Sequence, residues 1–511
     1  MMEFLGYSWL NYVVVILLLL ISTLFFIRFH IYNYWKRRGL VQAEGSLPWG
    51  SLKDFLLGKK FIAQVYADIY KQGAGHPMIG YYSFLSPGLV IRNPDLLKRI
   101  LVRDYDSFCD RGVYSNRELD PLSYHLFSTD GPQHREMRHV LSPSYSGSKM
   151  RFMFDTMQDC SHKLCEHLSD LVSSTGQGEK SLEIKPITNT YGLNVIASTA
   201  VGIDCNTFNG DNPLAEAALK VTDPDDIVQY LRLTLTLISP TVARLLNLRF
   251  TPKGVSDFYI DLVEKIVNHR KSENETRKDF MQVLLNMNEE IRKNEGADNR
   301  KPLGLDEIAA QTFLFILAGH ETTSAAICFI LYQLAVNQDV QNRLVAEIDS
   351  MNGDVNYDNI KDMEYLDMVL NETLRMYPAA PILIRNCVKN YRLPNGFVIE
   401  KGTQVLVPIY GLHMDPDYFP DPERFDPERF SKTAPSHTIH PFTFLPFGEG
   451  PRYCIGKRFG LASVKLGIIN ILSKFRVEPA VDTKIPLEIE KKTFVMNPYK
   501  GLTLKLVARD I

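Results

Sequence analysis

A long uninterrupted segment that starts at Asp306 places the strongest limit on how this chain can fold. The stretch "DEIAAQTFLFILAGHETTSAAICFILYQLAV" contains no proline and a single glycine. Asp306 is a suitable N-cap and Glu307 a suitable first-turn acid, so we expect a helix to begin here. At 1.5 Å per residue, some thirty residues make a helix about 45 Å long, which is enough to cross a whole domain.

The middle of this segment indicates what surrounds the helix. Apolar residues fall on nearly every face, which is typical of a helix buried in protein or in lipid. Gly319, His320, Glu321, Thr322 and Thr323 lie together at its centre. A carboxylate in the middle of a bilayer costs several kcal/mol. We therefore expect the central helix of a soluble domain, with a polar cluster halfway along it.

The amino terminus has a different hydrophobic pattern. Residues 4–27 carry no charge, and about 20 such residues suffice to cross a bilayer as a helix. Glu3 precedes this run, where a cleavable signal would be basic, and the bulky "LFFIRFHIY" ends it, so we expect a retained anchor. Arg28 and the basic residues 36–38 follow the run, which predicts a cytoplasmic body. A buried core helix is the alternative interpretation.

The remaining composition indicates one large domain after the anchor. We assign residues 1–38 to the anchor and its basic flank and residues 39–511 to a single domain, because no linker divides the chain after residue 50. Helical patterns and short β-rich pieces predict an α+β fold that is predominantly α-helical. The net charge of -2 gives no reason to expect nucleic acid as a partner. The scattered cysteines suit a reducing compartment, where sequons at Asn274 and Asn371 would be silent.

One cysteine, Cys454, lies in the glycine-rich stretch "FGEGPRYCIG", residues 447–456. A lone cysteine is most often a small buried hydrophobe. A zinc site would need another Cys or His within about four residues, and a nucleophile would need a general base nearby, and neither is visible. A thiolate ligand to haem iron needs one cysteine, backbone N–H groups and room for a flat macrocycle. Haem therefore ranks above zinc and nucleophile without excluding them.

Several segments together resemble one protein family. The haem-binding signature of the cytochrome P450 monooxygenases is similar to "FGEGPRYCIG" at Phe447, Gly450, Arg452, Cys454 and Gly456. The family's other signatures resemble, in the same order along the chain, "AGHETT" at 318–323, "ETLR" at 372–375 and "FDPERF" at 425–430. The resemblance covers essentially the whole chain and is strongest to the insect microsomal branch, family six.

The resemblance implies a fold with small β-sheets and a long central helix over a haem b, which is iron protoporphyrin IX. Cys454 would be the proximal iron ligand, in a loop that includes Phe447, Gly448 and Gly456. Iron, Arg452 and the helix that starts after Gly456 would each help to keep the thiol ionised. A haem thiolate pushes electron density onto the iron and favours cleavage of the O–O bond.

On the opposite face of the haem, the resemblance places Ala318 and Gly319 against the ring and the substrate. Glu321 and Thr322 would form the relay that brings protons to dioxygen without admitting bulk water. The alternative for Thr322 is a hydroxyl that bonds back to its own helix.

Glu372 and Arg375 are three positions apart and therefore share one face of a helix. As an exposed pair they would contribute a few tenths of a kcal/mol. The resemblance implies instead a buried network completed by a downstream arginine, and we choose Arg429 over Arg424 because "FDPERF" is the better match. Such a network would fix the loop that carries Cys454 rather than add net stability.

The haem propionates need charge-assisted hydrogen-bond donors, and the resemblance supplies Arg138, Arg385 and Arg452. His134 stands where the family usually has tryptophan, and its imidazole is a weaker candidate donor. We expect titration of this imidazole to make haem retention sensitive to pH.

Electrons must come from another protein. The chain has no GxGxxG after a strand and no spare length for a flavin module, so the expected donor is NADPH-cytochrome P450 reductase, with cytochrome b5 as a second donor. A basic patch would receive an acidic reductase. Its candidate residues are Arg135, His139, Lys457, Arg458 and Lys465. An ordinary solvated surface is the alternative for each of them.

The expected activity is insertion of one oxygen atom from O2 into a lipophilic xenobiotic or endogenous lipid at the endoplasmic reticulum membrane. Residues 233–246 are a candidate for contact with lipid. By resemblance, the substrate pocket would include residues 113–124, Phe313, Leu317, Ala318, 380–384 and 495–496. A second hypothesis is an isomerase of lipid peroxides, against which the pair of Glu321 and Thr322 argues. A third is a membrane-tethered haem sensor.

Overall fold

The computed structural model describes residues 2–203, 208, 212–273, 277, 279–293, 301–433, 439–499 and 501–509. The sequon at Asn274 lies outside these residues. The helices are α1 (Met2–Phe26), α2 (Tyr34–Arg37), α3 (Lys53–Leu56), α4 (Ile62–Gln72), α5 (Pro94–Lys98), α6 (Gly131–Leu141), α7 (Gly147–Ser173), α8 (Ile184–Val201), α9 (Pro213–Thr222), α10 (Ile227–Ile238), α11 (Pro240–Leu245), α12 (Lys253–Ser272), α13 (Phe280–Lys293), α14 (Leu305–Val336), α15 (Gln338–Ser350), α16 (Glu364–Met376), α17 (Ile409–His413) and α18 (Lys457–Lys474). The strands are β1 (Met78–Ser83), β2 (Ser86–Ile91), β3 (Glu179–Glu183), β4 (Leu383–Asn386), β5 (Tyr391–Arg392), β6 (Val398–Ile399), β7 (Gln404–Val407), β8 (Phe475–Pro479) and β9 (Thr503–Ala508).

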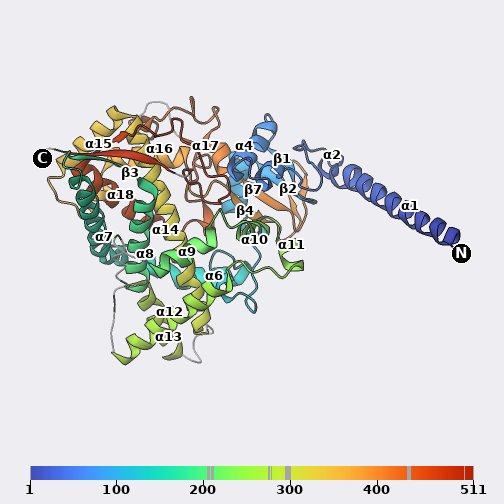
Figure 1. Cartoon of the computed structure of the whole chain (residues 1–511), viewed down its shortest axis with the longest axis horizontal. Helices are drawn as coiled ribbons and strands as arrows, with labels where there is room; N and C mark the ends of the chain where they lie inside the picture. The colour runs from blue at the N-terminus through green and yellow to red at the C-terminus, as the bar shows by residue number, and fades with distance from the viewer. Residues whose placement is uncertain are drawn as a thin grey trace.

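The predicted central helix is α14, which crosses the body in contact with α8, α12, α16 and α18 (Figure 1). Its N-cap is Gly304, whose N–H donates to Glu307 Oε2 at 2.9 Å. The prediction of Asp306 as the N-cap was therefore wrong. Asp306 lies within the first turn, where its carboxylate is 3.3 Å from Arg117 Nη2.

Two glycines allow α8 to lie close along α14. A Cβ on Gly192 would be 2.8 Å from the carbonyl oxygen of His320, and a Cβ on Gly319 would be 2.9 Å from the side chain of Ile196. The space at Gly319 is therefore used by α8. The predicted position of Gly319 against the haem ring and the substrate stays a prediction.

Helix α14 also joins two hydrophobic clusters. One cluster packs around α7, α8 and α18 and includes Ile327 of α14, and the other packs around α4 and the largest sheet and includes Ala325 and Phe329 of α14. Because neighbouring positions of α14 serve different clusters, apolar residues occupy nearly all of its faces. The predicted α+β class, predominantly helical, is confirmed.

The largest sheet brings distant segments of the chain together. Its strand order is β1-β2-β7-β4, with β2 and β7 parallel and the other pairs antiparallel. Strand β4 holds Arg385 opposite Val405 of β7. At its other edge, Asn386 N donates to Asp110 O at 2.7 Å. This bond places residues 109–112 beside Arg385. A second sheet, β3-β9-β8, lies near α7 and the C-terminus (Figure 1).

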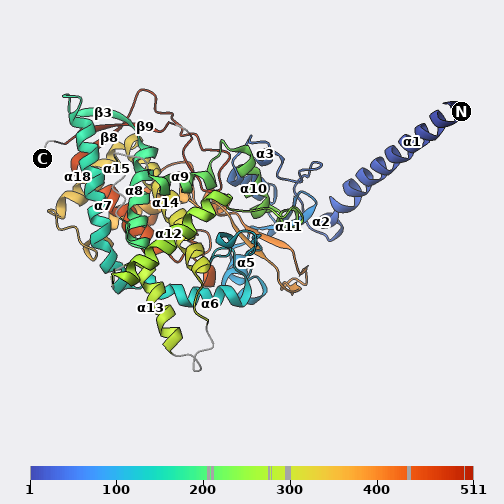
Figure 2. The same cartoon turned by 60° about the horizontal axis from the view of Figure 1, so that its bottom comes forward.

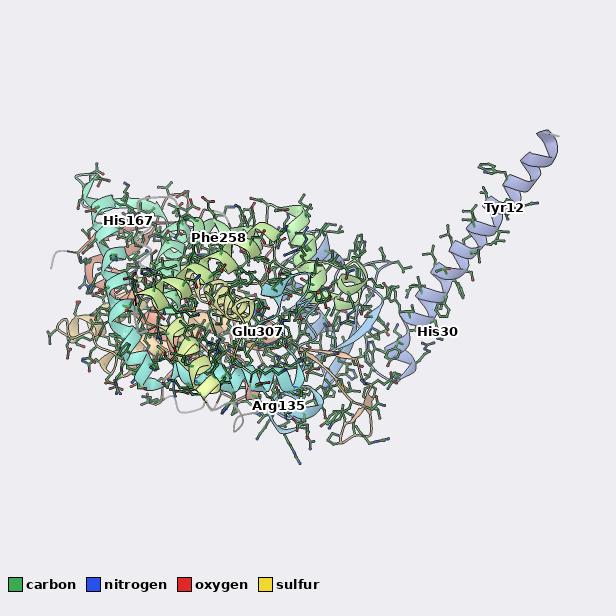
Figure 3. All side chains as sticks on the ribbon, turned by 90° about the horizontal axis from the view of Figure 1, so that it is seen from below. Tyr12, His30, Arg135, His167, Phe258 and Glu307 are labelled. Carbon is green, nitrogen blue, oxygen red and sulfur yellow. The ribbon has the colours of Figure 1, made fainter. Side chains whose placement is uncertain are left out.

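Helix α1 projects from the body in two views (Figures 1 and 2), and Figure 3 shows Tyr12 and His30 along this projection. The span Asn11–Ile31 has a mean hydropathy of 2.6 and is 0% buried, which is compatible with a membrane anchor. The corresponding span of α14 is 67% buried and is a core helix, as predicted. Core packing begins at Tyr32 and Trp35, each 1% exposed, earlier than the predicted division at residue 39.

Candidate functional site

The loop that carries Cys454 is fixed through its backbone. The N–H of Cys454 donates to Phe447 O at 2.8 Å. Gly448 and Gly450 have φ angles of 68° and 76°, in the region that favours glycine. A Cβ on Gly450 would also lie 1.9 Å from the carbonyl oxygen of Leu101, so no other residue fits there. Two independent constraints therefore hold this turn immediately before the cysteine.

Cys454 is the exposed cysteine among those that the structure describes. The surrounding protein nevertheless raises the pKa of its thiol by burial, against the opposing effects of the Gly456 N–H and the positive charges of Arg138 and Arg111. The thiol is therefore accessible although protein surrounds much of it. Lys457 adds a third positive charge that opposes this rise. A bound metal ion would favour the thiolate form of such a cysteine.

Three arginines meet beside this loop, and we call Arg111, Arg385 and Arg452 the arginine cluster. Arg111 is partly buried. Arg385 and Arg452 are 1% and 3% exposed. Burial and the charges of the other two arginines lower the pKa of Arg111 far below its usual range. Burial and the charge of Arg452 lower the pKa of Arg385 to about 10. Like charges buried together call for an anionic partner.

The protein provides few anionic groups for the arginine cluster. Asp130 Oδ1 lies 3.3 Å from Arg452 Nη2. Arg385 Nε, Arg452 Nη1 and His134 Nδ1 are buried without a hydrogen-bond partner among the described residues. Each such atom costs about 1–3 kcal/mol when left unpaired. Two carboxylates would satisfy these donors, so the residues present fit the propionates of a haem.

His134 lies against the arginine cluster and is 2% exposed. Burial, followed by the charges of Arg452 and Arg111, lowers its pKa to about 3. The imidazole is therefore neutral throughout the physiological range. The predicted pH sensitivity of haem retention stays a prediction, and burial with the neighbouring positive charges moves the titration of this imidazole to acidic pH.

Arg138 approaches the cysteine loop from α6. Its Nη1 donates to Tyr453 O at 2.9 Å, and its guanidinium carbon lies 4.5 Å from the centre of the Tyr453 ring. These contacts hold a partly exposed positive charge next to the residue that precedes Cys454. Arg138 therefore links α6 to the loop while adding positive potential at the thiol.

The polar centre of α14 has partners that differ from the predicted relay. Thr322 Oγ1 donates to Ala318 O at 2.7 Å, which is the alternative geometry, and the hydroxyl oxygen keeps its capacity to accept. Glu321 Oε1 accepts from Asn497 Nδ2 at 2.7 Å. Burial raises the pKa of Glu321, opposed by Lys185 and by the Asn497 bond. Ala318 is exposed within an otherwise buried helix, so α14 opens onto an interior space there.

The pair on α16 is buried, not exposed. Glu372 and Arg375 have 0% exposed side chains and form two hydrogen bonds of 2.7 and 2.9 Å. Arg429 Nε lies 3.3 Å from Glu372 Oε1. Arg424 contributes only its backbone oxygen, 3.4 Å from Arg375 Nη2. The two downstream arginines therefore occupy different positions, and the side chain of Arg429 is the one that faces Glu372.

This network extends toward the cysteine loop. Arg375 Nη1 donates to His413 O at 2.9 Å, and His413 Nε2 accepts from Leu445 N at 2.9 Å. Burial and the charge of Arg375 lower the pKa of His413 to about 3, so a neutral ring makes this contact. The buried charges of α16 are thereby connected to the segment just before Phe447.

Comparison with known proteins decides the family. The family model described as Cytochrome P450 matches residues 34–505. The chain belongs to the cytochrome P450 family. It is 36% identical to Cytochrome P450 6a2 of Drosophila melanogaster, over 97% of this chain and 99% of the relative. It is 34% identical to Cytochrome P450 6B7 of Helicoverpa armigera, over 98% and 99%. The predicted family, its likeness to family six and the monooxygenase class are confirmed.

The surface of this cytochrome P450 carries most of the predicted basic residues. Arg135, which Figure 3 places on α6, is exposed, as are His139, Lys457 and Arg458. Lys465 is 5% exposed, lies 2.8 Å from Asp367 and donates to Ile360 O at 2.6 Å, so its inclusion in an exposed patch was wrong. A surface hollow of about 510 Å³ lies next to this region. Its lining residues are Tyr105, Asp106, His134, Arg135, Arg138, His139, Ser142 and Pro451.

Some of the residues predicted to line the substrate pocket are exposed and others are buried. Ala318 and Ala380 are exposed and Leu317 is partly exposed. Phe313 is 0% exposed because it packs edge-on against Tyr259, with ring centres 5.2 Å apart. Met496 is 2% exposed. The last two side chains are therefore closed off by protein, which corrects the prediction that they line the pocket.

Three residues of the site were not predicted from the sequence. Arg111 stands in "SFCDRGVY", where a charged residue before a glycine was the only signal. Lys185 and Asn497 meet Glu321 only through the fold, and no local pattern marks Asn497. Lys185 is a charged residue in the mainly apolar stretch "IKPITNTYGLNVIASTAV". A charged side chain in such a helix is the signal that would have identified it.

Proposed function

We propose that this cytochrome P450 is a membrane-anchored monooxygenase that inserts one atom of O2 into a lipophilic small molecule, with electrons from NADPH through a reductase. The observation that carries the proposal is the accessible thiol of Cys454 beside an arginine cluster with unpaired donors. Cys454 would bind the iron of haem b, and Phe447, Gly448 and Gly456 would shape the loop around it. The arginine cluster, with Arg138 and His134, would hold the propionates.

The haem, when bound, supplies the iron at which dioxygen is reduced and split. Two electrons and two protons are consumed, so that one oxygen atom enters the substrate and the other leaves as water. Glu321 would take up and release protons at its carboxylate. Thr322 Oγ1 has already donated its hydrogen to Ala318, so it would accept a hydrogen bond from a protonated oxygen. Glu372, Arg375 and Arg429 would keep the cysteine loop in place.

A position at the cytoplasmic face of the endoplasmic reticulum follows from α1 and the basic residues after it. Exposed apolar side chains support a second contact with lipid. They are Ile227, Val228, Leu231, Leu245 and Leu246. Figures 1 and 2 both show α10 and α11 at the end of the body that carries α1. Within the predicted segment 233–246, Leu233 and Ile238 are buried, so lipid contact would come from its end and from the residues before it.

The reductase would dock on the basic surface of α6 and the start of α18. Arg135, Lys457 and Arg458 are exposed there, on the two elements that also hold the cysteine loop. Charge complementarity of this kind mainly raises the association rate. Cytochrome b5, which would offer a similar acidic surface, is proposed as a second donor at the same place.

The test is reconstitution of the full chain in lipid vesicles with NADPH-cytochrome P450 reductase, NADPH, 18O2 and a panel of lipophiles. We expect a product that contains one 18O atom and that forms only with reductase. Turnover of lipid peroxides without reductase would contradict the proposal in favour of an isomerase. Haem binding without turnover of any lipophile would contradict it in favour of a sensor.

A further inference from the structure

A line of polar side chains approaches Glu321 from the side of α8. Lys185 Nζ, in the first turn of α8, donates to Asn497 Oδ1 at 2.6 Å. Asn497 Nδ2 in turn donates to Glu321 Oε1 at 2.7 Å. The three residues come from α8, from the segment before β9 and from the middle of α14. Only the tertiary fold brings them together.

The chemistry of the three side chains fixes the direction of both hydrogen bonds. A lysine ammonium carries donors only, so it must meet the carbonyl oxygen of Asn497. The amide nitrogen of Asn497 then faces Glu321, and an ionised carboxylate offers acceptors only. The array therefore has one consistent order, cation to amide to carboxylate. This order suits the ionised form of Glu321.

Asn497 is held firmly by its own segment. Its backbone oxygen accepts from Glu490 N at 2.9 Å, and the neighbouring Met496 N donates to Ala379 O at 3.1 Å. Its amide nitrogen also donates to Val495 O at 3.3 Å. The residue is 5% exposed. The amide is thus a rigid bridge, and its orientation is set before Glu321 is considered.

The positive charge of Lys185 is balanced by Glu321 through the amide of Asn497. Lys185 has no ion-pair partner among the described residues, and its other polar contact is Ser324 Oγ at 3.4 Å. Burial lowers the pKa of Lys185, opposed by Cys328 and Glu321. Burial and Lys185 lower the pKa of His320 to about 4, so this neighbour on α14 is neutral. Glu321 is therefore the carboxylate that balances Lys185, with Asn497 between them.

We propose that Lys185 and Asn497 are positioning residues that hold Glu321 ionised, with Oε1 turned toward α8, between successive deliveries of protons to dioxygen. The inference rests on the role proposed above for Glu321. In each delivery Glu321 takes a proton from water at Oε2, the oxygen that Asn497 leaves free, and passes it to reduced dioxygen, which restores the carboxylate. An amide keeps its protons at neutral pH, so Asn497 orients the acid and does not carry the proton.

The test compares full-length variants reconstituted with reductase, NADPH and 7-ethoxycoumarin as the probe lipophile. The variants are Lys185→Met, Lys185→Arg, Asn497→Leu, Glu321→Gln, the double variant Lys185→Met/Glu321→Gln, and Lys465→Met. Haem content, NADPH oxidation, product and hydrogen peroxide are measured for each. Lys465→Met is the matched control, because Lys465 is also a buried lysine but contacts Asp367 and Ile360 instead of the centre of α14.

We expect Lys185→Met and Asn497→Leu to keep their haem while product formation falls about tenfold and peroxide per NADPH rises, as for loss of one hydrogen bond to a charged group. Lys185→Arg, which keeps a cation with donors only, should restore most of the coupling between NADPH and product. Lys465→Met should leave the coupling unchanged. The double variant should lose no more than Glu321→Gln alone, because Lys185 acts through Glu321.

The outcomes separate this inference from the proposal on which it rests. If Glu321→Gln keeps full coupling, the role of Glu321 fails and the inference fails with it. If Glu321→Gln uncouples but Lys185→Met and Asn497→Leu do not, only the inference fails. Multiplied losses in the double variant would also overturn it, because Lys185 would then act independently. If Lys185→Met does not retain haem, Lys185→Arg and Asn497→Leu test the same inference in its place.

Discussion

Two groups of arginines, one around Glu372 and the other the arginine cluster, differ in how far the protein itself satisfies them. Arg375 and Arg429 face the carboxylate of Glu372, and Arg375 also donates to the backbone oxygens of His413 and Pro422. In the arginine cluster, Arg452 Nη2 lies 3.3 Å from Asp130 Oδ1. Arg385 Nε and Arg452 Nη1 are buried without a hydrogen-bond partner among the described residues, and in the first group only Arg429 Nε is in that position. Arg375 is completely buried and has an acceptor at each guanidinium nitrogen, whereas Arg385 and Arg452 are almost as buried and each keep an unpaired nitrogen.

The difference separates a structural role from a ligand-binding one. A buried charge that is completely paired within the protein holds elements in register, and its removal damages the fold. A buried charge with unpaired donors costs free energy in the protein alone and gains it back when an anion binds. Substitutions around Glu372 should therefore damage the fold, and substitutions in the arginine cluster should weaken binding of the anion.

The largest effect is expected from Glu372→Gln. The substitution leaves the guanidinium groups of Arg375 and Arg429 buried without a counter-charge, which costs about 3–5 kcal/mol in the free energy of unfolding. Urea unfolding followed by far-UV circular dichroism measures it. The control is Glu428→Gln, whose carboxylate pairs with exposed Arg343 at 2.7 Å and contributes about 0–1 kcal/mol. Equal losses in the two variants would contradict a structural role for Glu372.

A smaller effect of a different kind is expected from Arg385→Gln. Removal of one of three crowded positive charges should leave the circular dichroism spectrum unchanged. Loss of a charge-assisted hydrogen bond worth about 1.5–3 kcal/mol should speed haem release at least about tenfold. Transfer of haem to apomyoglobin measures the rate. A variant that keeps the rate of haem release of the wild type, or one that loses its circular dichroism spectrum, would contradict a ligand-binding role for Arg385.

At neutral pH the smallest effect is expected for His134, because its contribution changes only on acidification. Its folded-state pKa of about 3 lies below the ordinary value of about 6.5, so below pH 6.5 the unfolded chain binds a proton that the folded chain does not. The stability that His134 contributes is complete above pH 6.5 and falls toward pH 3, by at most about 1.4 kcal/mol per pH unit.

The variant His134→Phe isolates this contribution, because the other buried histidines remain in both proteins. The difference in unfolding free energy between the wild type and His134→Phe should be constant from pH 7 to 8 and should change steadily below pH 6.5. A difference that changes between pH 7 and 8 instead would show that the imidazole titrates near neutrality.

Residues in continuous motifs could be predicted from the sequence, and residues gathered by the fold could not. The length and burial of α14, the cysteine loop and the spacing of Glu372 and Arg375 are local properties, so the pattern of the chain predicts them. Arg111 reaches the haem side only because Asp110 bridges to Asn386 of β4. That contact joins segments far apart in the chain and leaves no local trace.

The exposure of individual side chains was also difficult to predict from the sequence. Lys465 was expected at the surface because lysine usually lies there, yet Asp367 and the carbonyl oxygen of Ile360 satisfy it in the interior. Phe313 was expected to line a pocket, yet its ring is covered by Tyr259. In both cases a partner from another helix decides the exposure, and the partner cannot be identified from the residue itself.

The central claim is that the open thiol beside the arginine cluster is the haem site. The most direct measurement is the absorption spectrum of the ferrous carbonyl complex of Cys454→Ser, with Cys109→Ser as the control. Cys109 is buried near the same cluster, and its carbonyl accepts from Arg452 Nε at 2.8 Å. We predict that the thiolate-type band disappears in Cys454→Ser and persists in Cys109→Ser. A thiolate-type band that survives in Cys454→Ser would contradict the account.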